Sequence, residues 1–206
     1  MQGEARAAVH ATRGSGHVTE LIAAERPTSA RLDAVTAFGP LATFTTDGRR
    51  FALADFRHHV FYQGRATAAA IGQLLPLRLP AAELVSLLLG LPPLVEGAAP
   101  VRLTVDVERA VYVLWLASPL GDERIELDPR TLRPVAVAVG GRLDVPGYRA
   151  TFSDLGGAFD LPRDVQLVSA DGKTTVEIEW RERKVNPTLA PTLFTQPVPA
   201  GFQVAP

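Results

Sequence analysis

Histidine is the residue type in this chain best suited to acid–base or metal chemistry, and four are present: His10, His17, His58 and His59. His58 and His59 lie near Asp55 in the sequence. A metal or general-base site needs several groups that converge on one point. We expect His58 and His59 to be adjacent on a strand, where their side chains point to opposite faces. The sequence therefore predicts no metal site and no catalytic histidine.

Nucleophilic and phosphate chemistry also lack their usual motifs. No Gly-x-Ser-x-Gly sequence occurs, and no glycine-rich loop leads from a strand into a helix. The absence of cysteine excludes disulfides, thiolate metal sites and a cysteine nucleophile. We interpret the acidic residues of the later strands and turns as a solvated face: Asp106, Glu108, Asp122, Glu123, Glu126 and Asp128. We expect no enzyme and no cofactor; a hydrolase is a third alternative and would need a nucleophile–base pair that the sequence does not reveal.

The composition indicates a folded globular chain without an excess of basic residues. Of 206 residues, 47% are hydrophobic, so we expect one domain, 1–206, with a substantial core. The net charge is −1 and the basic residues, only two of them lysines (Lys173 and Lys184), are scattered, so nucleic acid is not expected as a partner. No apolar leader stands at the N-terminus. We expect any export signal or lipid-bearing cysteine to lie upstream of the given sequence.

The elements that would position a binding site centre on a helical insert at about residues 66–95. The spacing predicts one helix over Thr67–Leu75, with its first residue as N-cap, and a second over Pro80–Gly90. Within the second, only Glu83 and Ser86 are strongly polar. Such an apolar circumference indicates a helix that is covered on several sides or that covers an apolar surface. The insert is either a buried plug of the fold or a lid over a cavity.

Strands account for most of the remaining chain and are separated by glycine, proline and Asp-Gly turns. They are expected over Ala5–Thr12, Val18–Ala24, Ala30–Phe38, Leu41–Thr46, Arg50–Asp55, His59–Tyr62, Val101–Glu108, Ala110–Ser118, Arg124–Asp128, Arg133–Val139, Tyr148–Ser153, Val165–Ser169 and Thr174–Val185. A Pro-rich tail, 187–206, follows. The connections are too short for crossover helices, so the fold is predicted to be mainly β with a small α part and an antiparallel sheet. A sheet of about a dozen strands has to curl strongly or close.

Alternation along the strands indicates one apolar face. In the last long strand Val176, Ile178 and Trp180 alternate with charged residues. The concave face of a strongly curved sheet and the pair of helices are both apolar and both have to be buried. We therefore expect the helices to cap the concavity.

Three parts of the chain, in this order and spacing, resemble the superfamily of bacterial lipoprotein carriers and outer-membrane lipoprotein receptors (LolA/LolB-like and DUF4292-like proteins). They are Arg31–Pro40 with Phe44–Gly48 and Phe51–Asp55, then His59–Gly64 leading into the helical insert, and finally Leu193–Pro197 with Pro199–Phe202. The resemblance implies an unclosed β-barrel of about 11 antiparallel strands with a helical lid over a hydrophobic interior. It also implies non-catalytic binding of acyl chains or lipid-modified proteins, without a metal, in the periplasm or at the outer membrane. The lipobox cysteine of an anchored receptor is missing, so a soluble carrier and a trimmed receptor domain are both allowed.

The candidate site residues are the large apolar side chains of the presumed inner face and of the helical insert. For the cavity and lid they are Phe44, Phe51, Phe61, Leu74, Leu84, Leu88, Trp115, Phe152 and Trp180. For each of them, ordinary core packing is the alternative role. Phe38 stands apart, because it precedes Gly39-Pro40 at a hairpin tip, where it could contact a membrane or a partner or fold back on the sheet edge.

Two functions from different classes follow. The first is a monomeric, envelope-located protein that moves its lid helices to admit an acyl chain, for lipoprotein or lipid transport. The alternative is a structural or interaction domain of a cell-envelope assembly with the same fold, whose interior is filled by its own side chains.

Overall fold

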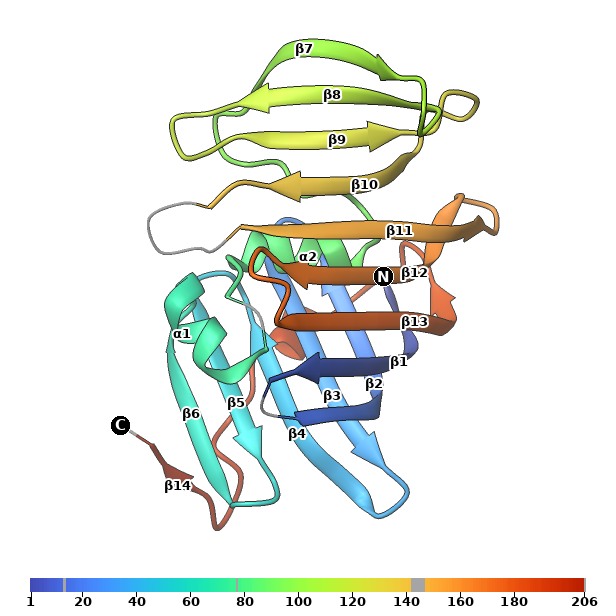
Figure 1. Ribbon diagram of the computed structural model, residues 1–206. Coiled ribbons are helices and arrows are strands. Elements are labelled where there is room, and N and C mark those ends of the chain that lie inside the picture. The colour runs from blue at the N-terminus through green and yellow to red at the C-terminus, as the bar shows by residue number, and fades with distance from the viewer. Residues whose placement is uncertain (13, 77, 142–146, 206) are drawn as a thin grey trace.

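One curved sheet makes up most of the structure (Figure 1). The computed structural model describes residues 1–12, 14–76, 78–141 and 147–205. Its strands are β1 (Gln2–Ala11), β2 (Gly14–Glu25), β3 (Ser29–Thr36), β4 (Gly39–Thr46), β5 (Arg50–Asp55), β6 (Val60–Arg65), β7 (Ala99–Asp106), β8 (Val111–Ala117), β9 (Glu123–Leu127), β10 (Pro134–Val139), β11 (Tyr148–Gly156), β12 (Leu161–Ser169), β13 (Thr174–Lys184) and β14 (Gln203–Val204). The helices are α1 (Ala68–Leu74), α2 (Ala81–Leu88) and a short 3-10 turn, η1 (Pro191–Phe194).

The strand order within the described residues is linear, from β14 at one edge to β7 at the other, so the sheet is curved but not closed. The first strand, β1, pairs with β13 and so joins the N-terminal strands to the C-terminal strands. Every pair is antiparallel except that of β14 with β6. These features confirm the predicted fold class. The 14 strands exceed the number that the resemblance implies, in part because the Pro-rich tail adds β14.

Both predicted helices are present, with ends that differ from the expected ones by one or two residues. Thr67 is the N-cap of α1, and its hydroxyl accepts a hydrogen bond of 3.2 Å from the Ala70 amide. The second helix, α2, begins after Pro80 and is followed by Gly90 at φ 71°. A Cβ at Gly90 would lie 2.5 Å from Cγ of Pro162, so glycine allows both the left-handed backbone and the close approach to β12.

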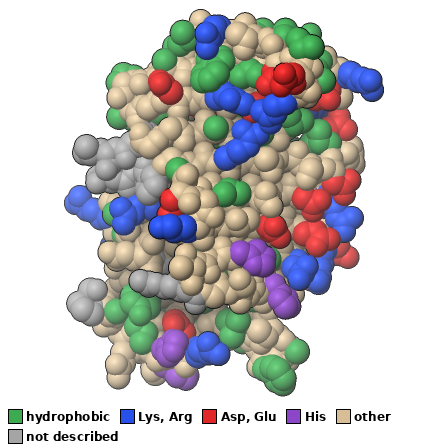
Figure 2. Space-filling model, viewed as in Figure 1, with side chains coloured by type: hydrophobic (Ala, Val, Ile, Leu, Met, Phe, Trp, Pro, Cys, Tyr) green, Lys and Arg blue, Asp and Glu red, His purple; other side chains and the backbone are tan. Residues whose placement is uncertain are grey.

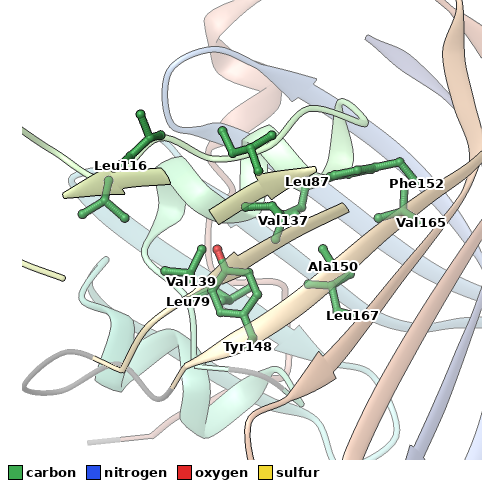
Figure 3. Packing of buried hydrophobic residues seen from close by; sticks show 12 residues of the cluster. Leu79, Leu87, Leu116, Val137, Val139, Tyr148, Ala150, Phe152, Val165 and Leu167 are labelled. Atoms are coloured by element: carbon green, nitrogen blue, oxygen red, sulfur yellow. The ribbon is translucent and has the colours of Figure 1, made fainter. Parts of the chain in front are cut away.

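The core lies between α2 and the concave face of the sheet. Leu87 of α2 belongs to a cluster with Phe152 and other residues of β8–β12, whose side chains converge in Figure 3. Val85 and Leu88, from the other side of the same helix, pack in a second cluster with Ile22 of β2 and others. The helix is therefore buried on two sides, as its apolar circumference indicates.

The convex face of β3–β6 is covered by the C-terminal segment. Nε2 of Gln196 donates hydrogen bonds to the carbonyls of Thr43 (2.9 Å) and Ala52 (3.2 Å). Further along the tail, the ring of Phe202 packs edge-on against Phe56 at 5.2 Å between centroids. The tail thus gives this part of the convex face an apolar cover of its own.

Glu126 on the convex face of β9 corrects the interpretation of the acidic residues as a solvated set, because its side chain is only 1% exposed. Burial by itself would raise the pKa of Glu126, but hydrogen bonds from Arg149, Arg109 and Arg124 outweigh it and hold the pKa at about 2. Figure 2 shows a group of basic side chains on the upper part of the face in view. Glu123 is also buried, on the other face, where its Oε2 accepts a hydrogen bond from the Val95 amide.

Candidate ligand-binding cavity

An apolar cavity of about 130 Å³ lies between the helices and the concave face of the sheet. Strands β1, β2, β3, β12 and β13 contribute one wall, and α2 with the α1–α2 connection contributes the other. The lining residues are Ala7, Val9, Glu20, Ile22, Leu32, Leu75, Pro76, Leu79, Leu84, Leu87, Leu88, Leu167, Val176 and Ile178. Aliphatic side chains dominate the lining, which suits a hydrocarbon ligand and offers almost nothing to a polar one.

The volume of the cavity sets what it can hold as it stands. An apolar cavity of about 150 Å³ accommodates a molecule the size of benzene. The cavity therefore holds only a short part of a long acyl chain unless α2 moves. Larger hollows exist on the surface, such as an open groove of about 600 Å³ lined by Asp33, Glu182, Lys184 and other residues. Their charged linings make them unsuitable for hydrocarbon.

Among the described residues, mostly apolar contacts hold α2 over the cavity, together with a buried hydrogen bond. The hydroxyl of Tyr148 on β11 donates to Oε2 of Glu83 on α2 at 2.7 Å, and both side chains are buried. Leu84 packs against the cluster that contains Val85 and Leu88 and also against a third cluster, formed by Phe44, Phe51, Ile71 and Ala81. Apolar contacts are non-directional, so a sliding or tilting helix can exchange them for contacts with a ligand chain. The hydrogen bond to Tyr148 gives the closed position a defined register.

Glu20 on β2 is the exception among the lining residues. Its Oε2 is buried, and no donor in the described part of the chain lies within hydrogen-bond distance of it. Burial, and to a smaller extent the negative charge of Asp33, raise the pKa of Glu20 to about 7. The ordinary pKa of a glutamate is 4.5, so the raised pKa moves the change of charge of this carboxyl to near neutral pH.

The structure brings six of the predicted side chains to the concave face near the helices. Leu84 and Leu88 line the cavity, whereas Phe44, Phe51, Phe152 and Trp180 pack in the surrounding clusters. Phe44 and Phe51 stack with ring centroids 6.4 Å apart and contact Ile71 of α1. These aromatic residues support the helices rather than face the open volume.

Two predicted lining residues lie on the opposite face, and their assignment to the cavity is wrong. Phe61 pairs with Ala54 across β5 and β6, and packs in a cluster with Phe202 of the tail. Trp115 pairs with Arg124 across β8 and β9, and its ring lies 5.6 Å from that guanidinium. In a strand, successive side chains point to opposite faces of the sheet. At these two positions both faces are covered, so the apolar character of the ring does not tell which face it is on.

Phe38 is fully exposed in the turn between β3 and β4. Its amide donates to Oγ of Thr36, which itself donates to the carbonyl of Gly39, so the turn is internally hydrogen-bonded and the ring points away from the sheet. The alternative in which Phe38 folds back onto the sheet edge does not occur. The side chain of Leu74 lies outside the described residues.

His58 and His59 lie in the turn before β6, not on a strand as expected. Nδ1 of His58 is 2.7 Å from Oδ2 of Asp55 at an exposed position, and the two histidines do not form a metal-binding group. Within the described residues, no group of three or more acidic, histidine or cysteine side chains could hold a metal ion.

Several lining residues were missed, and the most important of them is Glu20. A signal was available, because Glu20 interrupts the apolar series Val18, Ile22, Ala24 on one face of its strand. A carboxyl among core-facing positions indicates either a register error or a functional group. Leu79, in the connection between the helices, and Leu87, on α2, were also missed, because nothing in the sequence tells which apolar residues of the insert face open volume.

The raised pKa of Glu20 predicts a pH dependence of stability. The folded state holds this proton more tightly than the unfolded state, so the contribution is fully present below pH 4.5 and is lost as pH rises through about 7. The free energy of unfolding of the natural protein, minus that of Glu20→Gln, should fall between pH 5 and pH 8 by up to about 3 kcal/mol. Urea unfolding at unit pH steps measures it. Equal pH profiles of the two proteins would contradict the prediction, and Glu177→Gln on the convex face should follow the natural protein.

Comparison with known proteins gives a fold but no close relative. No family model matches the chain, and a search of curated proteins finds no match. Among solved structures, a LolA superfamily protein from Nitrosomonas europaea superposes with a TM-score of 0.64 at 12% identity, covering 95% of this chain and 90% of that one. An outer membrane lipoprotein-sorting protein domain from Vibrio parahaemolyticus gives a TM-score of 0.62 at 11% identity, with 93% and 88% covered.

A third similar structure is a DUF1329 family protein from Desulfovibrio piger, with a TM-score of 0.56 at 10% identity, covering 94% of this chain and 88% of that one. At such identities the likeness concerns the fold alone. The match extends over nearly the whole of each chain, so the curved sheet and its helices are shared as a unit. This chain therefore shares its fold with these proteins, one of which is a LolA superfamily protein.

Proposed function

We propose that the protein binds acyl chains, free or attached to lipid-modified proteins, between α2 and the concave face of the sheet, without catalysis. The observation that carries the proposal is the aliphatic cavity beneath a helix that is itself almost wholly apolar. A ligand chain of hydrocarbon can replace the contacts that the helix now makes with the sheet. The names of the two structural neighbours, a LolA superfamily protein and a lipoprotein-sorting domain, support a role in moving such ligands.

The energetics of such binding rest on partition from water. Each buried methylene contributes about 0.8 kcal/mol, so about ten methylenes supply about 8 kcal/mol before the costs of association and lid movement. No set of specific polar contacts is required to hold the chain. This reasoning fits a carrier, which has to release its cargo as well as bind it.

We propose the cell envelope of a bacterium as the location, in the periplasm or at the periplasmic face of the outer membrane, with the chain acting as one monomeric domain. The lipoprotein-sorting title of one neighbour supports this location. In the described part of the chain no helix has the length and apolar character needed to cross a membrane.

A second candidate is an interaction domain whose interior is filled by its own side chains. The small cavity volume, about 130 Å³, favours it. Native mass spectrometry of the purified protein separates the two candidates: a co-purified lipid mass supports the first, and a ligand-free protein that does not bind N-phenyl-1-naphthylamine, a neutral apolar fluorophore, supports the second.

Leu88→Asp tests the role of α2. Leu88 is 2% exposed and lines the cavity, so a carboxylate there should hydrate the site and displace the helix. We expect the affinity for N-phenyl-1-naphthylamine, measured by fluorescence titration, to fall at least about tenfold, since the lost burial exceeds 1.4 kcal/mol. The far-UV circular dichroism of the strands should persist.

Leu94→Asp is the matched control, because Leu94 follows the same helix but is 67% exposed. It should bind the fluorophore like the natural protein. Undiminished binding by Leu88→Asp with intact strands would show that α2 is not the lid.

We further propose that Phe38 inserts into a membrane surface, since its fully exposed ring stands at the tip of the β3–β4 hairpin. Burial of one phenylalanine is worth about 1.5–3 kcal/mol, so Phe38→Ser should lower binding to phosphatidylethanolamine–phosphatidylglycerol vesicles about tenfold or more. Vesicle flotation measures the bound fraction. Leu120→Ser, at another exposed turn, serves as the control. An unchanged bound fraction for Phe38→Ser would exclude insertion by this tip.

A further inference from the structure

Glu20 is the one charged side chain among the described residues that line the cavity, and all the others are aliphatic or proline. Its Oε2 is buried without a hydrogen-bond donor. A carboxyl in an apolar cavity destabilises the empty protein, because the group loses water and gains no partner. In binding sites such groups commonly receive their partner from the ligand, and a few polar groups of this kind fix its orientation.

The charged side chains of the strands on either side of β2 do not provide a hydrogen-bond donor or a cation to Glu20. On β3, Asp33 is on the convex face, where it accepts a 2.7 Å hydrogen bond from Nε of Arg31. On β1, Arg6 lies beside Glu177 in a hollow of the convex face. Neither neighbouring strand therefore supplies a cation to Glu20.

Among the residues that the structure describes, the helical side of the cavity also offers no cation to Glu20. Glu83 of α2 is bonded to Tyr148. Arg78, in the connection between the helices, packs its aliphatic stem against Gly72 of α1. Desolvation and the charge of Asp33 both disfavour the ionised form of Glu20. A cationic or hydrogen-bond-donating group beside the carboxyl would offset this cost, whereas another carboxylate would add to it.

We propose that the cavity selects amphiphiles whose polar end donates a hydrogen bond to Glu20, an amine or a hydroxyl group, and discriminates against carboxylates. This inference rests on the proposed function and adds the class of head group to it. The hydrocarbon chain lies under Leu84 and Leu88, and the donor group lies at the β2 wall. A fatty acid would instead bring its carboxylate toward a like charge, which is unfavourable in a medium that screens poorly.

Displacement of N-phenyl-1-naphthylamine by three ligands of equal chain length tests the proposal at pH 8, where Glu20 is mostly ionised. We expect dodecylamine to bind at least about tenfold more tightly than dodecanoate, with 1-dodecanol between them. In Glu20→Gln the difference between amine and carboxylate should shrink to about threefold or less, because the charge is gone while the side-chain volume stays. Glu177→Gln, which removes an exposed carboxylate from the convex face, should keep the full difference.

The possible outcomes separate this inference from the proposed function. Equal binding of dodecanoate and dodecylamine by the natural protein, with the fluorophore still bound, would overturn the head-group selection and leave hydrocarbon binding standing. A difference that persists in Glu20→Gln would overturn the role of Glu20. Failure of the natural protein to bind the fluorophore and all three ligands would contradict both proposals.

Discussion

The burial of α2 inside the curl of the sheet is the interaction on which the rest of the structure depends. The helix contacts opposite walls, with Leu87 packed on the C-terminal strands and Val85 and Leu88 packed on the N-terminal strands. Without it, the concave face would expose a continuous apolar surface to water. With it, the sheet can stay open at both edges and still bury the apolar side chains of its concave face.

A single helix in contact with two walls is also the simplest element to move. Its contacts are apolar and non-directional, and the hydrogen bond from Tyr148 to Glu83 is the polar contact that defines its closed position. A ligand chain that entered beneath the helix would replace one apolar contact with another, so we expect the exchange to have a small net cost. A cavity that is small in this structure could then accept a long chain, because movement of α2 would enlarge it.

Much of the fold could be predicted from the sequence, and the reasons are local. Turn residues such as Asp47-Gly48 divide the strands, Thr67 caps the first helix, and the apolar circumference of 80–90 indicates burial on several sides. These signals depend on neighbouring residues only, and the structure confirms the elements they predict.

The site was harder to predict because it depends on which face each strand turns toward the helices. Trp115 and Phe61 are aromatic residues that a second cover keeps from water, arginines in one case and the C-terminal tail in the other. The sequence pattern treats such rings as core without telling which face buries them. Glu126 was misjudged because two of its three arginine partners, Arg109 and Arg149, come from other parts of the chain, and only Arg124 is on the same strand.

If α2 moves when a ligand binds, the distance between this helix and the sheet has to change, and that distance can be measured. The chain has no cysteine, so spin labels attach only where cysteines are introduced. We choose Ala82→Cys, on the exposed side of α2, and Thr175→Cys on β13. Pulsed electron paramagnetic resonance then gives the distance between helix and sheet with and without saturating 1-dodecanol. We expect the distance to increase by about 5 Å or more when the alcohol binds, which is comparable with one helical turn. Bound alcohol with an unchanged distance distribution would contradict it.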